Sequence, residues 1–318
     1  MLDIIGIGRP VKDLLVAVDH MPEGDGAAMA RAVSSQGGGN CASAIVAAAR
    51  LGLACGMYAN IGDDAKGRFC RDDFIRHGVD VSHLSLEPNK TTPFCLCIAE
   101  TSSQTRRFIG QAGTASDLDP DALDYDYLRQ SRLIHFDGSG PAVQAAATFA
   151  RNNNIVTSID AGGYSPGYMR MEPLIDLFVA SEFYIKGRFP GKTPDEAVKL
   201  LAKTGCKVAV ITLGAKGLVG CAGNDFFSLP AFSGLDIVDT TGAGDVFHGA
   251  FASAYLMGME PVECARFASA VSYIKCTRIG GRSGIPNRDM VEHFLRHGEL
   301  ICAAELDERQ EFYKNLVV

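Results

Sequence analysis

An acidic residue stands where two closely spaced glycines separate an apolar strand from an apolar helix. The segment DIVDTTGAGDVFHGAFASAYLMG covers residues 236–258, with Gly242, Gly244 and Asp245 at its turn. The glycines lack the Cβ atoms that would keep a ligand away from the backbone. The first N–H groups of the following helix have no partners within the helix and lie at the positive end of its dipole. This turn therefore predicts a cradle for an anion such as a phosphoryl group.

Two roles are open to Asp245 in this turn. It could cap the helix, because Asp is common at N-caps and strand–turn–helix junctions occur in many α/β proteins. It could also accept a proton from a substrate hydroxyl while the amides stabilise charge on the transferred group, as phosphoryl transfer requires. Thr240 and Thr241 add polar groups here, and a second glycine-rich turn, QGGGN, begins at Gln36. These additions favour the catalytic role.

Strand-like and helix-like patterns alternate over most of the chain, which predicts a central, mostly parallel sheet with helices on both faces. Ligands bind where the strands of such a sheet lead into helices. Two segments, approximately residues 10–35 and 89–110, are extended but lack crossover helices. We expect them to pair into a small sheet that forms a lid, inserted into a single domain of residues 1–318.

The composition excludes several classes of protein. The formal net charge is −7 and no Lys/Arg run reaches five residues, which argues against nucleic-acid and anionic-membrane partners. No uninterrupted apolar run reaches ~18 residues, so no membrane-spanning segment is expected. Ten cysteines occur without a CxxC pair, which indicates buried free thiols in a reducing compartment. We expect a soluble, cytoplasmic protein.

Glycine-containing motifs extend along nearly the whole chain. In order they are QGGGNCASAIVAAARLG, IGDDAKGRF, VITLGAKG, DTTGAGD and KCTRIGGRSGIP. These motifs and their order resemble the ribokinase-like (PfkB) family of carbohydrate and nucleoside kinases. The resemblance implies a three-layer α/β sandwich with a central, mostly parallel sheet and a small β-sheet lid. It also implies a phosphotransferase with an alcohol group as acceptor.

The resemblance assigns catalytic and substrate-binding roles by position. The catalytic base falls on Asp245, and the amides that stabilise the phosphoryl group fall on Gly242, Ala243 and Gly244. The substrate site falls on Asp13, Gly38, Gly39, Ser43 and Asp137. Family members often have Asn where Ser43 stands, so the hydroxyl pattern that is recognised can differ.

Other polar residues join these two sites. On the lid, either Arg106 or Arg107 could reach an anionic substrate, although exposed strand arginines are usually solvated; Arg107 is included among the substrate-binding candidates. The resemblance places the ATP-contacting turn at Thr212 and Gly214. Lys216 could approach the ATP phosphates or only complete its turn. The nucleotide-binding candidates are therefore Thr212, Gly214, Lys216 and Thr241.

The resemblance implies ATP and Mg²⁺ as cofactors, and K⁺ as a candidate monovalent cation. Many members hold such a cation with the equivalent of Asp239 and with backbone carbonyls near Cys276 and Gly281. The family's Asn-x-x-Glu motif, which organises Mg²⁺ and phosphates, should fall near ASEFYIKG, but neither residue is in its place. Glu182 could replace it through a water molecule, or the metal could rely on the ATP phosphates alone.

Two histidines have simpler interpretations. His248 lies one turn into the apolar helix, where we expect it to pack and satisfy a local hydrogen bond. His135 and Asp137 alternate on one strand, but no third ligand at a readable spacing supports a metal site.

Together these assignments predict an ATP-dependent sugar kinase that transfers the γ-phosphoryl group to a hydroxymethyl group of a small carbohydrate. One alternative is a nucleoside or sugar-phosphate kinase on the same fold. The other is a catalytically silent sugar- or nucleotide-binding regulator, which the missing Asn-x-x-Glu motif favours. The expected partners are a sugar and ATP, and the free edges of the lid sheet predict a homodimer.

Overall fold

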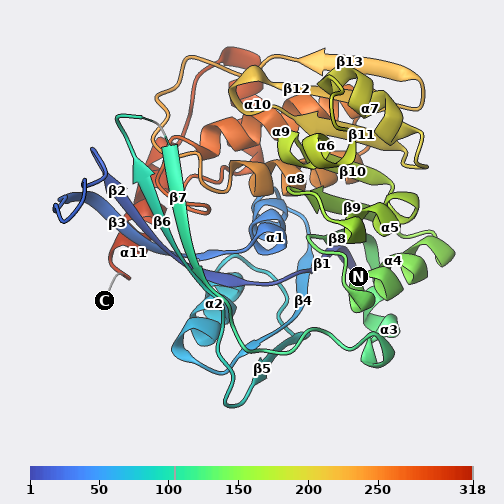
Figure 1. Ribbon diagram of the computed structural model, residues 1–318, viewed down its shortest axis with the longest axis horizontal. Coiled ribbons are helices and arrows are strands. Elements are labelled where there is room, and N and C mark those ends of the chain that lie inside the picture. The colour runs from blue at the N-terminus through green and yellow to red at the C-terminus, as the bar shows by residue number, and fades with distance from the viewer. Residues whose placement is uncertain (104, 317–318) are drawn as a thin grey trace.

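A sheet of nine strands forms the centre of the computed structural model, which describes residues 1–103 and 105–316 (Figure 1). In spatial order its strands are β13 (Asp225–Leu229), β12 (Leu218–Ala222), β11 (Val208–Thr212), β10 (Leu177–Ser181), β9 (Val156–Ala161), β8 (Ser131–Phe136), β1 (Leu2–Ile7), β4 (Cys55–Gly62) and β5 (Leu84–Glu87). Neighbouring strands are parallel except where β12 pairs with β11 and β13. The predicted mostly parallel sheet is confirmed.

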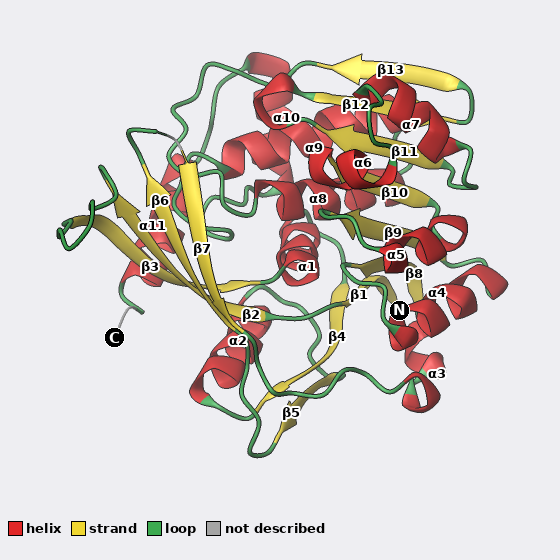
Figure 2. Cartoon of the chain, viewed as in Figure 1, coloured by secondary structure: helices red, strands yellow, loops and turns green. Residues whose placement is uncertain are grey.

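Helices cover both faces of this sheet (Figure 2). The helices on one side are α1 (Asn40–Arg50), α2 (Ala65–Arg76), α8 (Ala243–Leu256), α9 (Pro261–Lys275), α10 (Arg288–His297) and α11 (Ala303–Lys314). Those on the other side are α3 (Tyr125–Leu128), α4 (Pro141–Asn152), α5 (Pro166–Met171), α6 (Glu182–Arg188) and α7 (Pro194–Ala202). Short 3₁₀ turns lie at η1 (Pro120–Ala122), η2 (Glu172–Leu174) and η3 (Gly214–Lys216). The molecule is therefore a three-layer α/β sandwich, as predicted.

Strand residues point alternately to the two helical layers and so build two hydrophobic cores. In β10, Leu177 and Val179 lie in the core under α1 and α8. Phe178 and Ala180 lie in the opposite core, under α4 and α7. Both faces of the strand are buried, which is why its sequence is a continuous apolar run rather than an alternating one.

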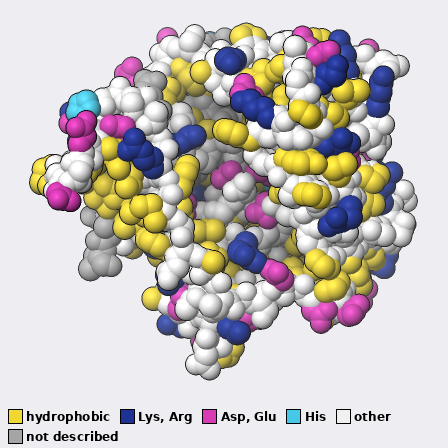
Figure 3. Space-filling model, in the orientation of Figure 1, with side chains coloured by type: hydrophobic (Ala, Val, Ile, Leu, Met, Phe, Trp, Pro, Cys, Tyr) yellow, Lys and Arg dark blue, Asp and Glu magenta, His cyan; other side chains and the backbone are white. Residues whose placement is uncertain are grey.

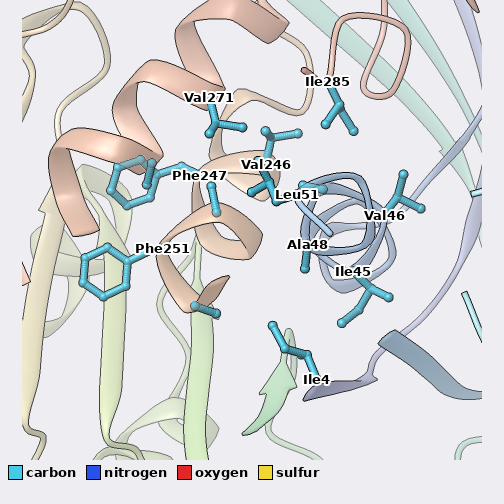
Figure 4. Close-up of a cluster of buried hydrophobic side chains, with 14 of the residues drawn as sticks. Ile4, Ile45, Val46, Ala48, Leu51, Val246, Phe247, Phe251, Val271 and Ile285 are labelled. Atoms are coloured by element: carbon cyan, nitrogen blue, oxygen red, sulfur yellow. The ribbon is translucent and has the colours of Figure 1, made fainter. Parts of the chain in front are cut away.

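The helix that follows the glycine turn is held in place by apolar packing. Val246, Phe247 and Phe251 of α8 are buried against α1 and α9, as Figure 4 shows around Ile45 and Val271. The wide apolar surface expected for this helix is confirmed. Because nearly every turn of α8 is buried, its first residues have a fixed position at the sheet's edge.

A second, smaller sheet has four strands in the order β3 (Ala30–Gly38), β2 (Val11–Val18), β6 (Phe94–Glu100) and β7 (Thr105–Gln111). β2 is antiparallel to β3 and parallel to β6, and β6 and β7 form a hairpin. These strands come from the two segments expected to form the lid. The ends of β3 and β7 extend slightly beyond the predicted limits of 35 and 110.

The order of the central strands reverses beside β1. The chain passes from β1 to β4 and β5 on one side, and later to β8, β9, β10 and β11 on the other. Crevices for ligands open at such a reversal, at the carboxyl ends of the strands. Within residues 1–103 and 105–316, none of the helices combines the length and the apolar character needed to cross a bilayer.

Candidate active site

Acidic residues gather where the carboxyl ends of β1, β8 and β9 meet the start of α8. Asp137 directly follows β8, Asp160 lies near the end of β9, and Asp245 lies in the first turn of α8. Figure 3 shows the molecule hollowed between the small sheet and the main body, with acidic side chains inside the hollow. This is the place that the strand reversal predicts for a ligand.

The glycine turn before α8 has an unusual backbone. Gly242 is the N-cap residue and has φ +74°, in the left-handed region that favours glycine. An added Cβ would lie 2.8 Å from Cα of Gly281, so a side chain is also excluded by contact. The Ala243 amide donates to the Thr240 carbonyl at 3.2 Å. Among the described residues, the amides of Gly242 and Gly244 have no backbone acceptor, so they are the donors left for an anion.

Asp245 follows Gly244 in the first turn of α8, and its carboxyl group accepts the amide of its own residue. Burial, and after it the negative charge of Asp160, raise the pKa of Asp245 to about 6. The charges of His248 and Lys275 act in the opposite direction. A carboxyl group with such a pKa can accept a proton near neutral pH more readily than an exposed Asp can.

The pKa values of Asp13 and Asp137 are also raised by burial near Asp245. An added Cβ at Gly38 would lie 2.0 Å from Oδ2 of Asp13, so the carboxyl group rests directly on the glycine turn of β3. Burial raises the pKa of Asp13 to about 7; Arg282 opposes this and the charge of Asp245 adds to it. Burial also raises the pKa of Asp137 to about 7, although its Oδ2 accepts the Cys41 amide at 2.9 Å. The structure brings the three predicted acids together.

Asp160 is a fourth acid of this group that sequence reasoning missed. Its Oδ1 lies 3.2 Å from Nε2 of His248, and its Oδ2 accepts from Asn40 at 3.2 Å. His248 therefore has the local bond that was predicted for it. The same rule that singled out Asp137, an acid at the carboxyl end of a buried strand, could have identified Asp160 in IVTSID.

The other three predicted substrate residues lie at the N-cap of α1, on α1 and on β7. Gly39 has φ +94° and caps α1, directly before Asn40. Ser43 is buried on α1, and an added Cβ at Gly281 would lie 3.8 Å from its Oγ. Arg107 is exposed on β7 with its Nη2 3.9 Å from Oε2 of Glu100. It does not reach the glycine turn.

The neighbouring lid residue reaches the turn instead. Arg106 donates to Oγ1 of Thr240, because adjacent residues of a strand point to opposite faces. Thr241 is also contacted from the lid, since Sγ of Cys97 lies 3.3 Å from its Oγ1. The small sheet therefore touches the turn that carries Asp245.

Three of the four predicted nucleotide residues lie at the end of β11 and directly after it. Thr212 ends β11 and its Oγ1 donates to the Ala180 carbonyl at 3.3 Å. Gly214 has φ +59° and begins η3, which ends at the exposed Lys216. Nζ of Lys216 lies 3.8 Å from Oε1 of Glu182. Thr212, Gly214 and Lys216 therefore lie at the carboxyl edge of the sheet, as the substrate acids do, but after β11 rather than β8 or β9. Thr241 lies apart from them, in the turn before α8.

The positions expected for Asn-x-x-Glu have structural roles. Oγ of Ser181 accepts the amides of Phe183 and Tyr184 and so caps α6. The buried Tyr184 donates its hydroxyl to Glu172 at 2.6 Å. Oε2 of Glu182 lies 3.3 Å from Nζ of Lys186 and its Oε1 lies 3.8 Å from Nζ of Lys216, so both oxygens face lysines. In the described part of the chain no three His, Cys, Asp or Glu side chains cluster to hold a metal ion.

Most of the groups expected to hold a monovalent cation already have partners within the protein. Oδ1 of Asp239 accepts from the amide and hydroxyl of Thr241, and its Oδ2 accepts the Gly280 amide. The Cys276 carbonyl accepts the amides of Val238 and Asp239. The carbonyls of Asp239 and Thr241 accept from Nζ of Lys275, a residue that the sequence reading did not consider. Its position four residues after the buried Val271 on α9 was the available signal.

The fold and the site together define a phosphotransferase with an alcohol group as acceptor. A family model described as "pfkB family carbohydrate kinase" matches residues 2–288, so the chain belongs to this family. The predicted family, fold class and enzyme class are confirmed.

Known proteins similar to this chain agree with that result. A ribokinase of Haemophilus influenzae is 26% identical over 274 residues, which cover 82% of this chain and 87% of the relative. An ATP-dependent ribose-1-phosphate kinase of Halopiger xanaduensis is 25% identical over 93% of this chain and 98% of the relative. The crystal structure of a candidate ribokinase II from E. coli, in complex with ATP and Mg²⁺, has a TM-score of 0.80 at 23% identity. It covers 93% of this chain and 99% of its own.

Proposed function

We propose that this carbohydrate kinase transfers the γ-phosphoryl group of ATP to a hydroxymethyl group of a small sugar, with Asp245 as the base. One observation carries the assignment: Asp245 directly follows a glycine turn at the start of a buried helix, and the Gly242 and Gly244 amides of that turn have no backbone acceptor within the described residues. The carboxylate would take the hydroxyl proton, and the Gly242 and Gly244 amides would stabilise charge on the phosphoryl group. The amide of Ala243 would join them only after releasing Thr240.

The acidic lining favours a neutral, hydroxyl-rich substrate. Asp13 and Asp137 present carboxyl groups that accept hydrogen bonds from sugar hydroxyls. The same groups would repel a phosphate, which disfavours a sugar phosphate as substrate. Gly38 and Gly39 would let the sugar lie against the backbone, and Ser43 would line the deeper side. Arg107 would act only on a substrate that extends toward the outer lid.

The E. coli complex with ATP and Mg²⁺ supports both as cofactors, and the name of the Halopiger xanaduensis relative supports ATP. We assign nucleotide binding to Thr212, Gly214 and Lys216, with Thr241 nearest to the transferred group. Mg²⁺ supplies charge neutralisation between the phosphates and keeps several of its waters. The phosphates would therefore hold it, with Glu182 as the carboxylate on that side of the site.

Release of ADP across a substrate panel tests this function. The panel contains pentoses, hexoses, their phosphates and nucleosides, with water alone as the control for uncoupled ATP hydrolysis. We expect saturable ADP release with at least one free sugar. Turnover only with nucleosides or sugar phosphates would support the alternative kinase. Binding of ligands without turnover for the whole panel would instead show the silent regulator.

The raised pKa values predict how the reaction depends on pH. Asp245 must be ionised to act as a base, so its reactive fraction is lost as the pH falls through about 6. We expect kcat/KM for the sugar to fall by about tenfold between roughly pH 8 and pH 5. Asp13, with a pKa of about 7, would steepen the fall if the sugar requires its carboxylate. A kcat/KM that stays flat over this range, in enzyme shown to remain folded, would contradict the role of Asp245.

Two further proposals concern the setting of the enzyme. Phe108 and Ile109 are more than half exposed on the edge strand β7, which supports a homodimer through the lid sheet. The molar mass from light scattering tests whether the protein is a dimer.

All ten cysteines are free and eight are buried, which supports a reducing, cytoplasmic compartment. Fractionation of expressing cells tests that location.

A further inference from the structure

The side chain of Lys275 ends in the interior of the protein. Lys275 is the last residue of α9 and is fully buried, which is rare for lysine. Its Nζ donates to the carbonyl oxygen of Asp239 at 2.9 Å and to the carbonyl oxygen of Thr241. A buried ammonium group is costly unless it has such partners. The sequence therefore places a cation in the core, where burying an apolar side chain would cost less free energy.

The two carbonyls belong to the turn that leads into the phosphoryl cradle. Asp239 and Thr241 lie three residues and one residue before Gly242, and their carbonyl oxygens converge on one point inside the protein. Two converging carbonyls beside a buried carboxylate form a site of the kind that attracts a cation. Here a nitrogen of the chain itself occupies that point.

The charge of this nitrogen acts on both acids of the turn. Although burial acts to raise it, the pKa of Asp239 is held below its ordinary value by Lys275 and by hydrogen bonds from Thr241 and Gly280. Lys275 also opposes the rise in the pKa of Asp245. Close by, the α9 residue Ser272 donates to the Ala243 carbonyl at 2.7 Å, so α9 holds the turn at two points.

We propose that the ammonium group of Lys275 is a built-in cation that orders the Asp239–Gly244 turn, so that this enzyme needs no monovalent metal ion. Lys275 is a positioning residue: it touches neither sugar nor ATP and acts through the carbonyls of the turn. The carbonyl oxygens of Asp239 and Thr241 already accept from Lys275, and both carboxylate oxygens of Asp239 accept backbone amides. These four oxygens are therefore not free to coordinate K⁺. This inference rests on the proposed kinase function for its kinetic test, but not for its structural one.

The kinetic test compares salts on the unmodified enzyme. Initial rates with the best sugar are measured at equal ionic strength in potassium chloride and in tetramethylammonium chloride, whose cation is too large for the turn. We expect rates that agree within about twofold. Activation by K⁺ of tenfold or more would overturn the inference.

The structural test needs no turnover. Thallium(I), which replaces K⁺ and scatters anomalously, is soaked into crystals of the unmodified protein and of Lys275→Ala. We expect no thallium peak at the turn of the unmodified protein and a peak between the Asp239 and Thr241 carbonyls in the variant. A peak in the unmodified protein would overturn the inference even if no sugar of the panel were phosphorylated.

The same variant separates positioning from simple stabilisation. Lys275→Ala is expected to lower kcat by about tenfold or more with little change in KM for the sugar, because the amides of the turn lose their alignment. Methylammonium or K⁺ should restore several-fold of this loss. Lys203→Ala, on the exposed end of α7, is the matched control and should respond to neither cation. If Lys275→Ala folds and keeps a normal kcat in both salts, the role of Lys275 is purely structural and the inference is wrong. If Lys275→Ala does not fold, the salt comparison and the thallium soak of the unmodified enzyme still test the inference.

Discussion

Asp245→Asn is expected to lower kcat by ~10²-fold or more while ATP binding is almost unchanged. The amide side chain of Asn keeps the size of the carboxyl group but cannot accept the hydroxyl proton. The amides of Gly242 and Gly244 remain in place, so the nucleotide should still bind. Turnover is measured by ADP release with the best sugar, and ATP affinity by calorimetry.

The stability of this variant gives a second readout. The pKa of Asp245 is raised because the folded protein disfavours its charged form. A neutral Asn removes that penalty, so the melting temperature near neutral pH should stay equal or rise. Asp195→Asn is the matched control, because Asp195 is exposed in the first turn of α7. Near-normal turnover of Asp245→Asn would remove Asp245 from the role of base.

Arg282→Met is expected to lower the free energy of unfolding by about 3–5 kcal/mol. Arg282 is fully buried and pairs with Asp73 of α2, which is buried as well. Tyr313 of α11 also donates to Asp73, at 2.7 Å. Removing the guanidinium group would leave the Asp73 carboxylate buried without its main compensating charge. Urea denaturation at neutral pH measures the loss.

Two comparisons make this result specific. Arg296→Met removes an exposed ion pair with Glu292 on α10 and should cost at most about 1 kcal/mol. Asp73→Leu combined with Arg282→Met removes both buried charges and should recover part of the loss. If Arg282→Met alone has the same free energy of unfolding as the unmodified protein, the buried Asp73–Arg282 pair is not needed for stability.

This experiment also tests the domain organisation. Arg282 lies under the glycine turn of β3, since an added Cβ at Gly37 would fall 2.1 Å from its Nη1. The Asp73–Arg282 pair thus joins the main body to the base of the small sheet. We propose that residues 1–318 unfold as one unit, with the lid segments 10–35 and 89–110 included. Two separate urea transitions would contradict this.

Local patterns in the sequence were sufficient for the architecture and for most of the acids. Alternating apolar runs and helical patterns predicted the mostly parallel sheet, because the period of burial is a property of each segment alone. Asp137 was identified because it ends a buried strand, and Asp245 because it follows Gly242 and Gly244. Such signals depend on a few neighbouring residues, so they can be read before the chain is folded.

Contacts between distant segments were decided only by the tertiary structure. Arg106 and Arg107 point to opposite faces of the edge strand β7, so only one of them can reach the glycine turn. The structure shows that Arg106 does so. Asp160 joins the site through partners on α1 and α8. Lys275 meets the Asp239 carbonyl across 36 positions of sequence. The physical reason is that a buried charge is tolerated only beside its partners, and folding alone determines which distant groups become those partners.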